Sequence, residues 1–159
     1  MCGGLIFMRH SDEYYMKRAL QEAEKARTED EVPIGAVVVL DGKIIARGHN
    51  QRENKNDPTS HAEVEAIKKA CKKLSSWRIP GCELYVTVEP CPMCAGLISA
   101  SRIKRVIFGT EDLKGGALNE EFNLYEKAKL NHCPEVRGGV LKEECASIIK
   151  DYFKAKRQK

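Results

Sequence analysis

The sequence contains no hydrophobic run that approaches the ~18 apolar residues of a membrane-spanning helix. Near its start the longest apolar run is Leu5-Ile6-Phe7-Met8, which is too short for a signal peptide and follows no basic residue. We therefore expect a soluble, cytoplasmic protein with no membrane partner. Met8 is an alternative to Met1 as the start, and residues 1–10 are expected to be a disordered leader.

A disulfide framework is also not expected, because the number of cysteines is odd and no signal peptide is evident. The default interpretation of each cysteine is a small buried hydrophobic residue. Cys71 and Cys145 fit this interpretation, since each shares a helix face with apolar residues at helical spacing. The full set is Cys2, Cys71, Cys82, Cys91, Cys94, Cys133 and Cys145.

The net charge is small and the hydrophobic share is large, at +4 and 42%, which excludes a disordered chain. The length of 159 residues suits one domain, and the chain has no internal repeat and no linker. Gly115-Gly116 and Gly138-Gly139 are isolated pairs and do not form a phosphate-binding motif. We therefore expect a single domain over residues 1–159.

Hydrophobic periodicity predicts that helices and strands alternate along most of the chain. Ser11 can cap the first helix, and Ser60 or Thr59 can cap the second. A hairpin followed by alternating strands and helices is typical of a layered α/β domain. The predicted helices are 12–27, 61–74, 90–100 and 140–156. The predicted strands are 34–40, 43–48, 83–88 and 105–109.

Two short motifs indicate chemistry: His61-Ala62-Glu63 and Pro90-Cys91-Pro92-Met93-Cys94. Cys91 and Cys94 are three residues apart at a helix start, so their side chains share one face. Free backbone amides at that end stabilise the thiolate form that zinc binds. His61 begins another helix, and two helix starts that meet at a sheet edge would bring one imidazole and two thiolates together.

The number of ligands distinguishes two kinds of zinc site. A structural site is usually closed by four protein ligands, whereas three leave a position for a water, whose pKa zinc lowers to around 7. Glu63 could carry protons at that position without binding the metal. Other interpretations are a redox-active pair, half of a zinc knuckle, or a site closed by Cys82, Cys133, His49 or His132.

In combination, the His-x-Glu and Pro-Cys-x-x-Cys motifs resemble the signature of the zinc-dependent cytidine and deoxycytidylate deaminase superfamily. Further stretches are similar to the bacterial tRNA-specific adenosine deaminase family and together extend from Asp12 nearly to the end of the chain. They are Glu31-Val32-Pro33-Ile34-Gly35-Ala36, Asp57-Pro58-Thr59, Leu84 to Cys91, Met93-Cys94-Ala95-Gly96, Ser101-Arg102-Ile103 and Asn131-His132. The resemblance implies a three-layer α/β/α, cytidine-deaminase-like fold with a central mixed sheet.

This family converts adenosine to inosine at the wobble position of a tRNA, so the resemblance implies the reaction and its residues. His61, Cys91 and Cys94 would hold one Zn2+ per subunit. Glu63 would move a proton from the zinc-bound water to the adenine ring and then to the departing ammonia. A nucleotide in a loop is already partly unstacked, which lowers the cost of extruding it into the site.

The resemblance also implies how the substrate is bound. Asn50 and the main chain at Ala62 would bind the base, and a homodimer would contact the tRNA anticodon loop through both subunits. For Tyr152, helix packing is an equally good interpretation. RNA contacts are implied for Asp112, Lys114, Phe153, Lys154 and Arg157.

Some features depart from the family pattern and keep other functions open. Residues 118–125 and Cys133 are untypical and would lie on the substrate side, and Glu89-Pro90-Cys91-Pro92-Met93-Cys94 also occurs in guanine deaminases. One alternative is therefore a deaminase of a free base or nucleotide of the guanine, cytosine or cytidine type. A second alternative is a zinc- and RNA-binding module without catalysis.

The small positive charge is concentrated at one end of the chain. Residues 150–159 contain five of the 27 Lys and Arg and one of the 23 Asp and Glu, so the rest of the chain is balanced. Such a patch predicts salt-sensitive RNA binding, because each neutralised phosphate releases counterions. A solvated helix end that favours cations near its negative pole is the alternative interpretation.

Overall fold

The structure is a computed structural model that describes residues 8–158. The first seven residues of the expected leader lie outside the described residues. Arg9 and His10, which we expected to belong to it, contact the domain: the Arg9 guanidinium donates to the Tyr85 hydroxyl at 2.7 Å. The ring of His10 stacks on that of Tyr14 with 3.8 Å between centroids. The leader therefore does not extend to residues 9 and 10.

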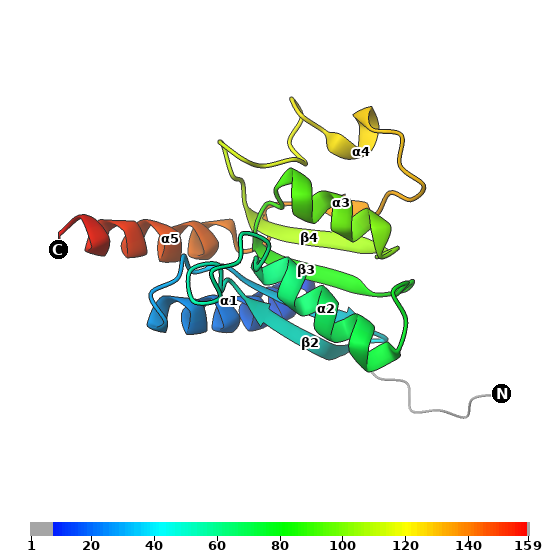
Figure 1. Cartoon of the computed structure of the whole chain (residues 1–159), viewed down its shortest axis with the longest axis horizontal. Helices are drawn as coiled ribbons and strands as arrows, with labels where there is room; N and C mark the ends of the chain where they lie inside the picture. The colour runs from blue at the N-terminus through cyan, green and yellow to red at the C-terminus, as the bar shows by residue number, and fades with distance from the viewer. Residues whose placement is uncertain (1–7, 159) are drawn as a thin grey trace.

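Five strands form one mixed sheet in the order β2-β1-β3-β4-β5 (Figure 1). β1 is antiparallel to both of its neighbours, whereas β3, β4 and β5 are parallel to one another. The strands are β1 (Gly35–Leu40), β2 (Lys43–His49), β3 (Glu83–Val88), β4 (Arg105–Thr110) and β5 (Glu135–Arg137). The helices are α1 (Asp12–Thr28), α2 (Ala62–Leu74), α3 (Pro92–Ala100), α4 (Leu124–Lys127) and α5 (Lys142–Arg157).

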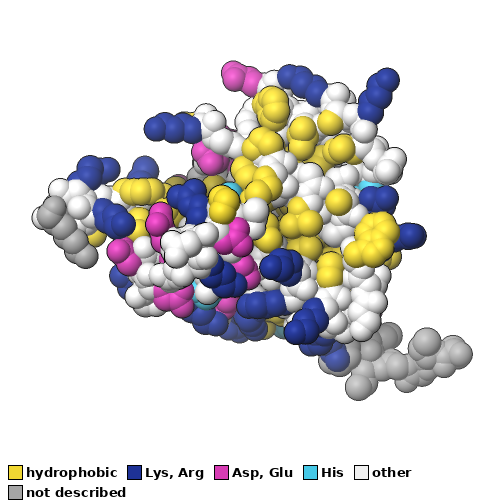
Figure 2. Space-filling model, in the orientation of Figure 1, with side chains coloured by type: hydrophobic (Ala, Val, Ile, Leu, Met, Phe, Trp, Pro, Cys, Tyr) yellow, Lys and Arg dark blue, Asp and Glu magenta, His cyan; other side chains and the backbone are white. Residues whose placement is uncertain are grey.

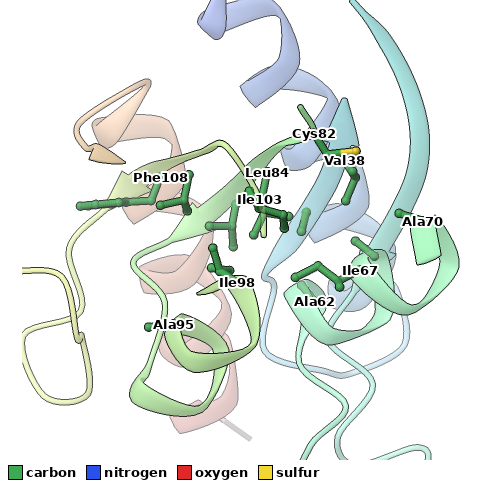
Figure 3. Close-up of a cluster of buried hydrophobic side chains, with 14 of the residues drawn as sticks. Val38, Ala62, Ile67, Ala70, Cys82, Leu84, Ala95, Ile98, Ile103 and Phe108 are labelled. Atoms are coloured by element: carbon green, nitrogen blue, oxygen red, sulfur yellow. The ribbon is translucent and has the colours of Figure 1, made fainter. Parts of the chain in front are cut away.

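Helices cover both faces of the sheet, which confirms the expected three-layer α/β/α fold. Because side chains alternate along a strand, Val38 faces one helical layer while Val37 and Val39 face the other. The first layer contains α2 and α3, whose apolar side chains pack on the strands in Figure 3. The second layer contains α1 and α5. Cys145 of α5 is fully buried there, as its position on the apolar face predicted.

One glycine allows the start of α2 to approach the sheet closely. A Cβ at Gly48, near the end of β2, would lie 2.5 Å from the carbonyl oxygen of Ala62. Contacts this short do not occur, so only glycine lets the start of α2 lie against this strand. His61 and Glu63 lie at this end of α2.

Two elements were not predicted. α4 is a single turn, and β5 has three exposed residues that pair only with β4 among the described strands. Neither is long enough to show the periodicity of a buried face, and β5 is defined only by its pairing with β4. No helix in residues 8–158 is long and apolar enough to cross a membrane.

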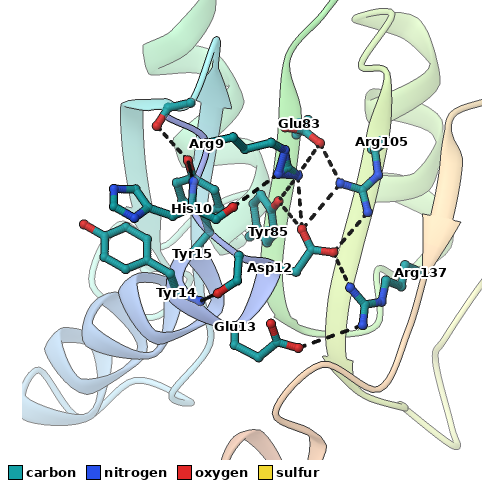
Figure 4. A network of polar contacts seen from close by, with 12 residues as sticks. Arg9, His10, Asp12, Glu13, Tyr14, Tyr15, Glu83, Tyr85, Arg105 and Arg137 are labelled. Atoms are coloured by element: carbon teal, nitrogen blue, oxygen red, sulfur yellow. Dashed lines mark hydrogen bonds and ion pairs between the residues drawn. The ribbon is translucent and has the colours of Figure 1, made fainter. Parts of the chain in front are cut away.

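Charged side chains join α1 to the starts of β3 and β4 (Figure 4). The Asp12 carboxylate accepts hydrogen bonds from the Tyr85 hydroxyl at 2.6 Å and from Arg105 at 3.1 Å. Glu83 accepts from Arg105 at 2.7 Å and from Arg9 at 2.8 Å. The network therefore fixes the N-terminal helix to the edge of the sheet where β3 and β4 begin.

Candidate active site

The starts of α2 and α3 meet where β3 ends. His61 and Cys91 occupy the N-cap positions of these helices, with extended backbones and no capping bond from their side chains. The expectation that Ser60 or Thr59 caps α2 is wrong, because His61 is the N-cap residue; the Thr59 hydroxyl bonds to Asp57 at 2.7 Å. Both cap side chains are therefore available to turn toward each other.

The structure brings the three predicted metal ligands together. Nδ1 of His61 lies 3.7 Å from Sγ of Cys91 and 3.6 Å from Sγ of Cys94. Tetrahedral zinc with Zn–N of about 2.05 Å and Zn–S of about 2.3 Å requires N–S separations of roughly 3.6 Å. One nitrogen and two sulfurs at these distances fit a zinc ion.

Electrostatics favour the form of Cys91 that binds a metal. A hydrogen bond from the Cys94 thiol, followed by one from His61, lowers the pKa of Cys91 to about 4 despite partial burial. Cys91 also lies at the N-cap of α3, where unpaired backbone amides stabilise negative charge. These groups therefore favour the thiolate form of Cys91.

None of the four candidates for a fourth ligand joins the three residues in the described chain. His49 bonds to Glu29 at 2.9 Å, and His132 bonds to the carbonyl of Ile103 at 2.6 Å. Cys82 is buried in the core, and the Cys133 thiol contacts the carbonyl of Tyr125. The arrangement therefore corresponds to a site with an open position and argues against a closed structural site.

A cavity of about 180 Å³ opens beside these ligands. It is smaller than the ~300 Å³ at which pockets for drug-sized ligands begin, so it admits a single ring system. Its lining contains predicted site residues: Asn50, His61, Ala62, Glu63, Cys91 and Asp112. It also contains residues that the sequence analysis missed: Val32, Ile34, Arg52, Val88 and Glu89.

Glu63 lies in the first turn of α2 with its carboxyl group buried. Burial raises the pKa of this carboxyl. A carboxyl group whose pKa is shifted toward neutrality can both accept and donate a proton. Its position in the cavity lining beside His61 suits a proton carrier that is not itself a ligand.

Two further polar groups face the cavity. The Asn50 side chain donates to the carbonyl of Val32 at 3.3 Å and accepts from the amide of Arg52 at 3.1 Å, which fixes its orientation. The amide of Ala62 belongs to the first turn of α2, where N–H groups have no partner within the helix. Both positions can therefore hydrogen-bond a ring placed in the cavity.

The predicted RNA-contacting residues divide into two groups. Asp112 lines the cavity, and Lys114 follows it on the same loop with its side chain exposed. Phe153, Lys154 and Arg157 are exposed on α5 and do not belong to the described cavity lining. Tyr152 is buried, and its hydroxyl donates to the carbonyl of Asp30 at 3.1 Å, which supports the packing interpretation.

Comparisons with known proteins agree with this geometry. A model of the MafB19-like deaminase family matches residues 10–157. The chain is 50% identical over 148 residues to the tRNA-specific adenosine deaminase of Bacillus subtilis, covering 93% of this chain and 92% of that protein. The chain belongs to the tRNA-specific adenosine deaminase family.

Solved structures confirm the fold expected for a tRNA-specific adenosine deaminase. One, from a study of A-to-I editing by tRNA deaminases at the wobble position of transfer RNA, has a TM-score of 0.82 and 47% identity. The match covers 85% of this chain and 98% of that one. A guanine deaminase from Bacillus subtilis has a TM-score of 0.61 and 45% identity, over 64% of this chain and 66% of that one. Deaminases named for different substrates therefore share the cytidine-deaminase-like fold.

Proposed function

We propose that the chain hydrolytically deaminates adenosine to inosine at the wobble position of a tRNA anticodon loop. The observation that carries this proposal is the convergence of His61, Cys91 and Cys94 on a cavity that admits one ring system and contains the buried Glu63. The names of the relatives with up to 50% identity support tRNA adenosine as the substrate.

The cofactor in this proposal is Zn2+, one ion per subunit. His61, Cys91 and Cys94 would hold it, since their mutual distances suit tetrahedral coordination. When bound, zinc lowers the pKa of a water from 15.7 to around 7 and so supplies a nucleophile at neutral pH.

Glu63 is proposed as the proton carrier. Its carboxylate takes a proton from the attacking water and passes it to the ring nitrogen beside the reacting carbon. A second proton from the water then reaches the departing amino group by the same route, so that adenosine and water become inosine and ammonia. Burial suits this role, because it brings the pKa of the carboxyl closer to neutrality.

The base would be held by groups whose positions are already fixed. The Asn50 amide, oriented by Val32 and Arg52, can bond to the ring, and the Ala62 amide can donate to it. The small cavity leaves the ribose and the neighbouring nucleotides outside. A nucleotide extruded from a loop fits this geometry, because loop bases are accessible without opening a duplex.

RNA binding around and beyond the cavity is assigned to two surfaces. Asp112 and Lys114 lie on the loop beside the cavity, where a nucleotide entering it would pass. On α5, Phe153 is 41% exposed and can stack on a base, while Lys154 and Arg157 can contact phosphates. These contacts make salt-sensitive binding an expected property.

We also propose that the protein is a homodimer located in the cytoplasm with its tRNA substrate. Figure 2 shows hydrophobic side chains gathered over the region of α3 and α4. On α3, Met93 is exposed and Leu97 is half-buried, and Phe122, two residues before α4, is also exposed. Exposed apolar patches of this kind mark protein interfaces. Sedimentation equilibrium should give the dimer mass at micromolar protein, and a monomer would contradict this assignment.

Inosine mapping tests the proposed reaction. The zinc-loaded protein is incubated with an arginine tRNA that carries adenosine at the wobble position, and inosine is located by sequencing. We expect conversion at that position alone, and none with the matched variant Glu63→Ala. Absence of conversion by the zinc-loaded protein would refute the proposal.

Deamination of a free base is the second candidate. The resemblance to guanine deaminase and a cavity that admits one purine-sized ring system favour it. A free base would not contact the exposed cations of α5, so the double variant Lys154→Ala/Arg157→Ala separates the two candidates. The first predicts weaker tRNA editing, and the second predicts unchanged turnover of guanine or cytosine.

A further inference from the structure

Two buried glutamates take no part in the chemistry above: Glu89 lines the cavity, and Glu31 directly precedes Val32, which also lines it. Glu31 is 1% exposed and lies between α1 and β1, and Glu89 is 3% exposed and directly follows β3. None of the ion pairs among the described residues involves either one. A buried carboxylate without a cation is costly unless hydrogen bonds compensate for its lost hydration.

Backbone amides of one loop surround the carboxylate of Glu89. Its Oε1 accepts from the amide of Asp112 at 3.1 Å, and its Oε2 accepts from the amide of Leu118 at 2.8 Å. The Asn119 side chain adds a longer bond to Oε2 at 3.4 Å. A Cβ at Gly116 would lie 2.3 Å from the carboxyl carbon, so the loop is packed directly against this group.

Glu31 binds a second loop in the same way. Its Oε1 accepts from the amide of Glu53 at 3.0 Å, and its Oε2 accepts from the amide of Asn54 at 2.8 Å. This loop carries Arg52, which lines the cavity, just as the loop held by Glu89 carries Asp112. Each buried carboxylate therefore binds one of the loops that contribute side chains to the cavity.

We propose that Glu31 and Glu89 are positioning residues that hold these two loops in the conformation that receives the substrate nucleotide. The inference rests on the proposed function, since it assigns the two loops to the entrance for an RNA nucleotide. Hydrogen bonds to ionised groups are stronger than neutral ones, so each carboxylate restricts its loop before RNA arrives. Pre-organised loops lose less entropy on binding, which lowers KM.

The variants Glu89→Gln and Glu31→Gln test the proposal with little change in shape. A glutamine keeps one acceptor oxygen but places an amino group against a backbone N–H, so at least one loop amide loses its partner. With an anticodon stem-loop as substrate, we expect KM to rise about tenfold, the factor that corresponds to ~1.4 kcal/mol. The kcat value and the zinc content should stay near those of the wild type.

Glu13→Gln is the matched control, because it neutralises an exposed glutamate on α1 outside the described cavity lining. It should leave KM unchanged. An unchanged KM in both Glu89→Gln and Glu31→Gln would overturn the proposal. So would a fall in kcat at constant KM, since that result indicates a smaller active fraction and a purely structural role.

Amide hydrogen exchange provides a second measurement that needs no substrate. In the zinc-loaded protein, Glu89→Gln should accelerate exchange at Asp112 and Leu118 and spare Glu53 and Asn54. Glu31→Gln should produce the reverse pattern. Uniform acceleration in both variants would refute separate control of the two loops.

A second variant and a separate assay of the wild type keep a folding defect, a failure of this inference and a failure of the proposed function apart. If Glu89→Gln does not fold, Gly116→Ala disturbs the same contact from the loop side, because its methyl group would collide with the Glu89 carboxyl. We expect the same rise in KM, and an unchanged KM would count against the proposal. Wild-type inosine formation is scored separately, so a failure of the proposed function is not confused with a failure of this inference.

Discussion

Replacement of Asp12 by asparagine should destabilise the domain by about 2 kcal/mol at pH 7. The Asp12 side chain is 7% exposed. Burial alone would raise its pKa, but hydrogen bonds from Arg105, Tyr85 and Arg137 outweigh burial and lower the pKa from 3.8 to about 2. A pKa unit corresponds to 1.36 kcal/mol, so a depression of nearly two units stabilises the folded state by about 2 kcal/mol.

The sign of the shift defines the pH range of this effect. A depressed carboxyl pKa contributes stability above the unfolded value near 4 and loses it as the pH falls toward 2. The loss in Asp12→Asn should stay below the ~3–5 kcal/mol of a fully buried broken pair. Arg9 and Arg137 are 40% and 52% exposed, and Arg105 keeps its bond to Glu83.

Urea unfolding followed by circular dichroism measures this difference at equal protein and zinc concentrations. In thermal unfolding the same loss corresponds to about 4–8 °C. Glu135→Gln is the control, because Glu135 is 75% exposed and lies 3.8 Å from Arg105, which predicts a loss below about 0.5 kcal/mol. The reasoning is refuted if Asp12→Asn lies within about 0.5 kcal/mol of the wild type at pH 7. A difference that does not shrink below pH 4 would also refute it.

Other predictions concern the site and the RNA surface. Glu63→Ala should retain zinc and tRNA binding but lower kcat by at least about a hundredfold, as measured by inosine formation, and near-normal kcat would contradict its role. Cys91→Ser should reduce bound zinc, measured by atomic absorption, from about one ion per chain to well below half, because a hydroxyl is a poorer ligand. Lys154→Ala/Arg157→Ala should lower the salt slope of log K for tRNA by up to about 2, and an unchanged slope would exclude phosphate contacts at both residues.

The longer elements could be predicted from the sequence because each buries one face. The valine run of β1 and the apolar stripe of α2 are visible in the sequence as hydrophobic patterns. The predicted bounds of these two elements differ from those in the structure by one residue. β5 has no such signal, since its three exposed residues form a strand only through pairing with β4. α4 is too short for periodicity to appear.

Part of the candidate site could also be predicted, because its residues form short motifs that are visible in the sequence. The spacing of Cys91 and Cys94 and the position of His61 at a helix start already predict that three candidate metal ligands lie together, as the structure shows. Glu31 and Glu89 could not be recognised, because their partners are backbone amides of distant loops. Every residue except proline has such an amide, so no residue type marks the contact in the sequence.

A competition between two substrates tests the central claim most directly. The zinc-loaded wild type receives an anticodon stem-loop with adenosine at the wobble position together with free guanine, and the initial rates of inosine and xanthine formation are compared. We predict that kcat/KM for the stem-loop exceeds that for guanine by at least about a hundredfold, and that Glu63→Ala abolishes the inosine product. Rapid conversion of guanine with an unmodified stem-loop would contradict the account.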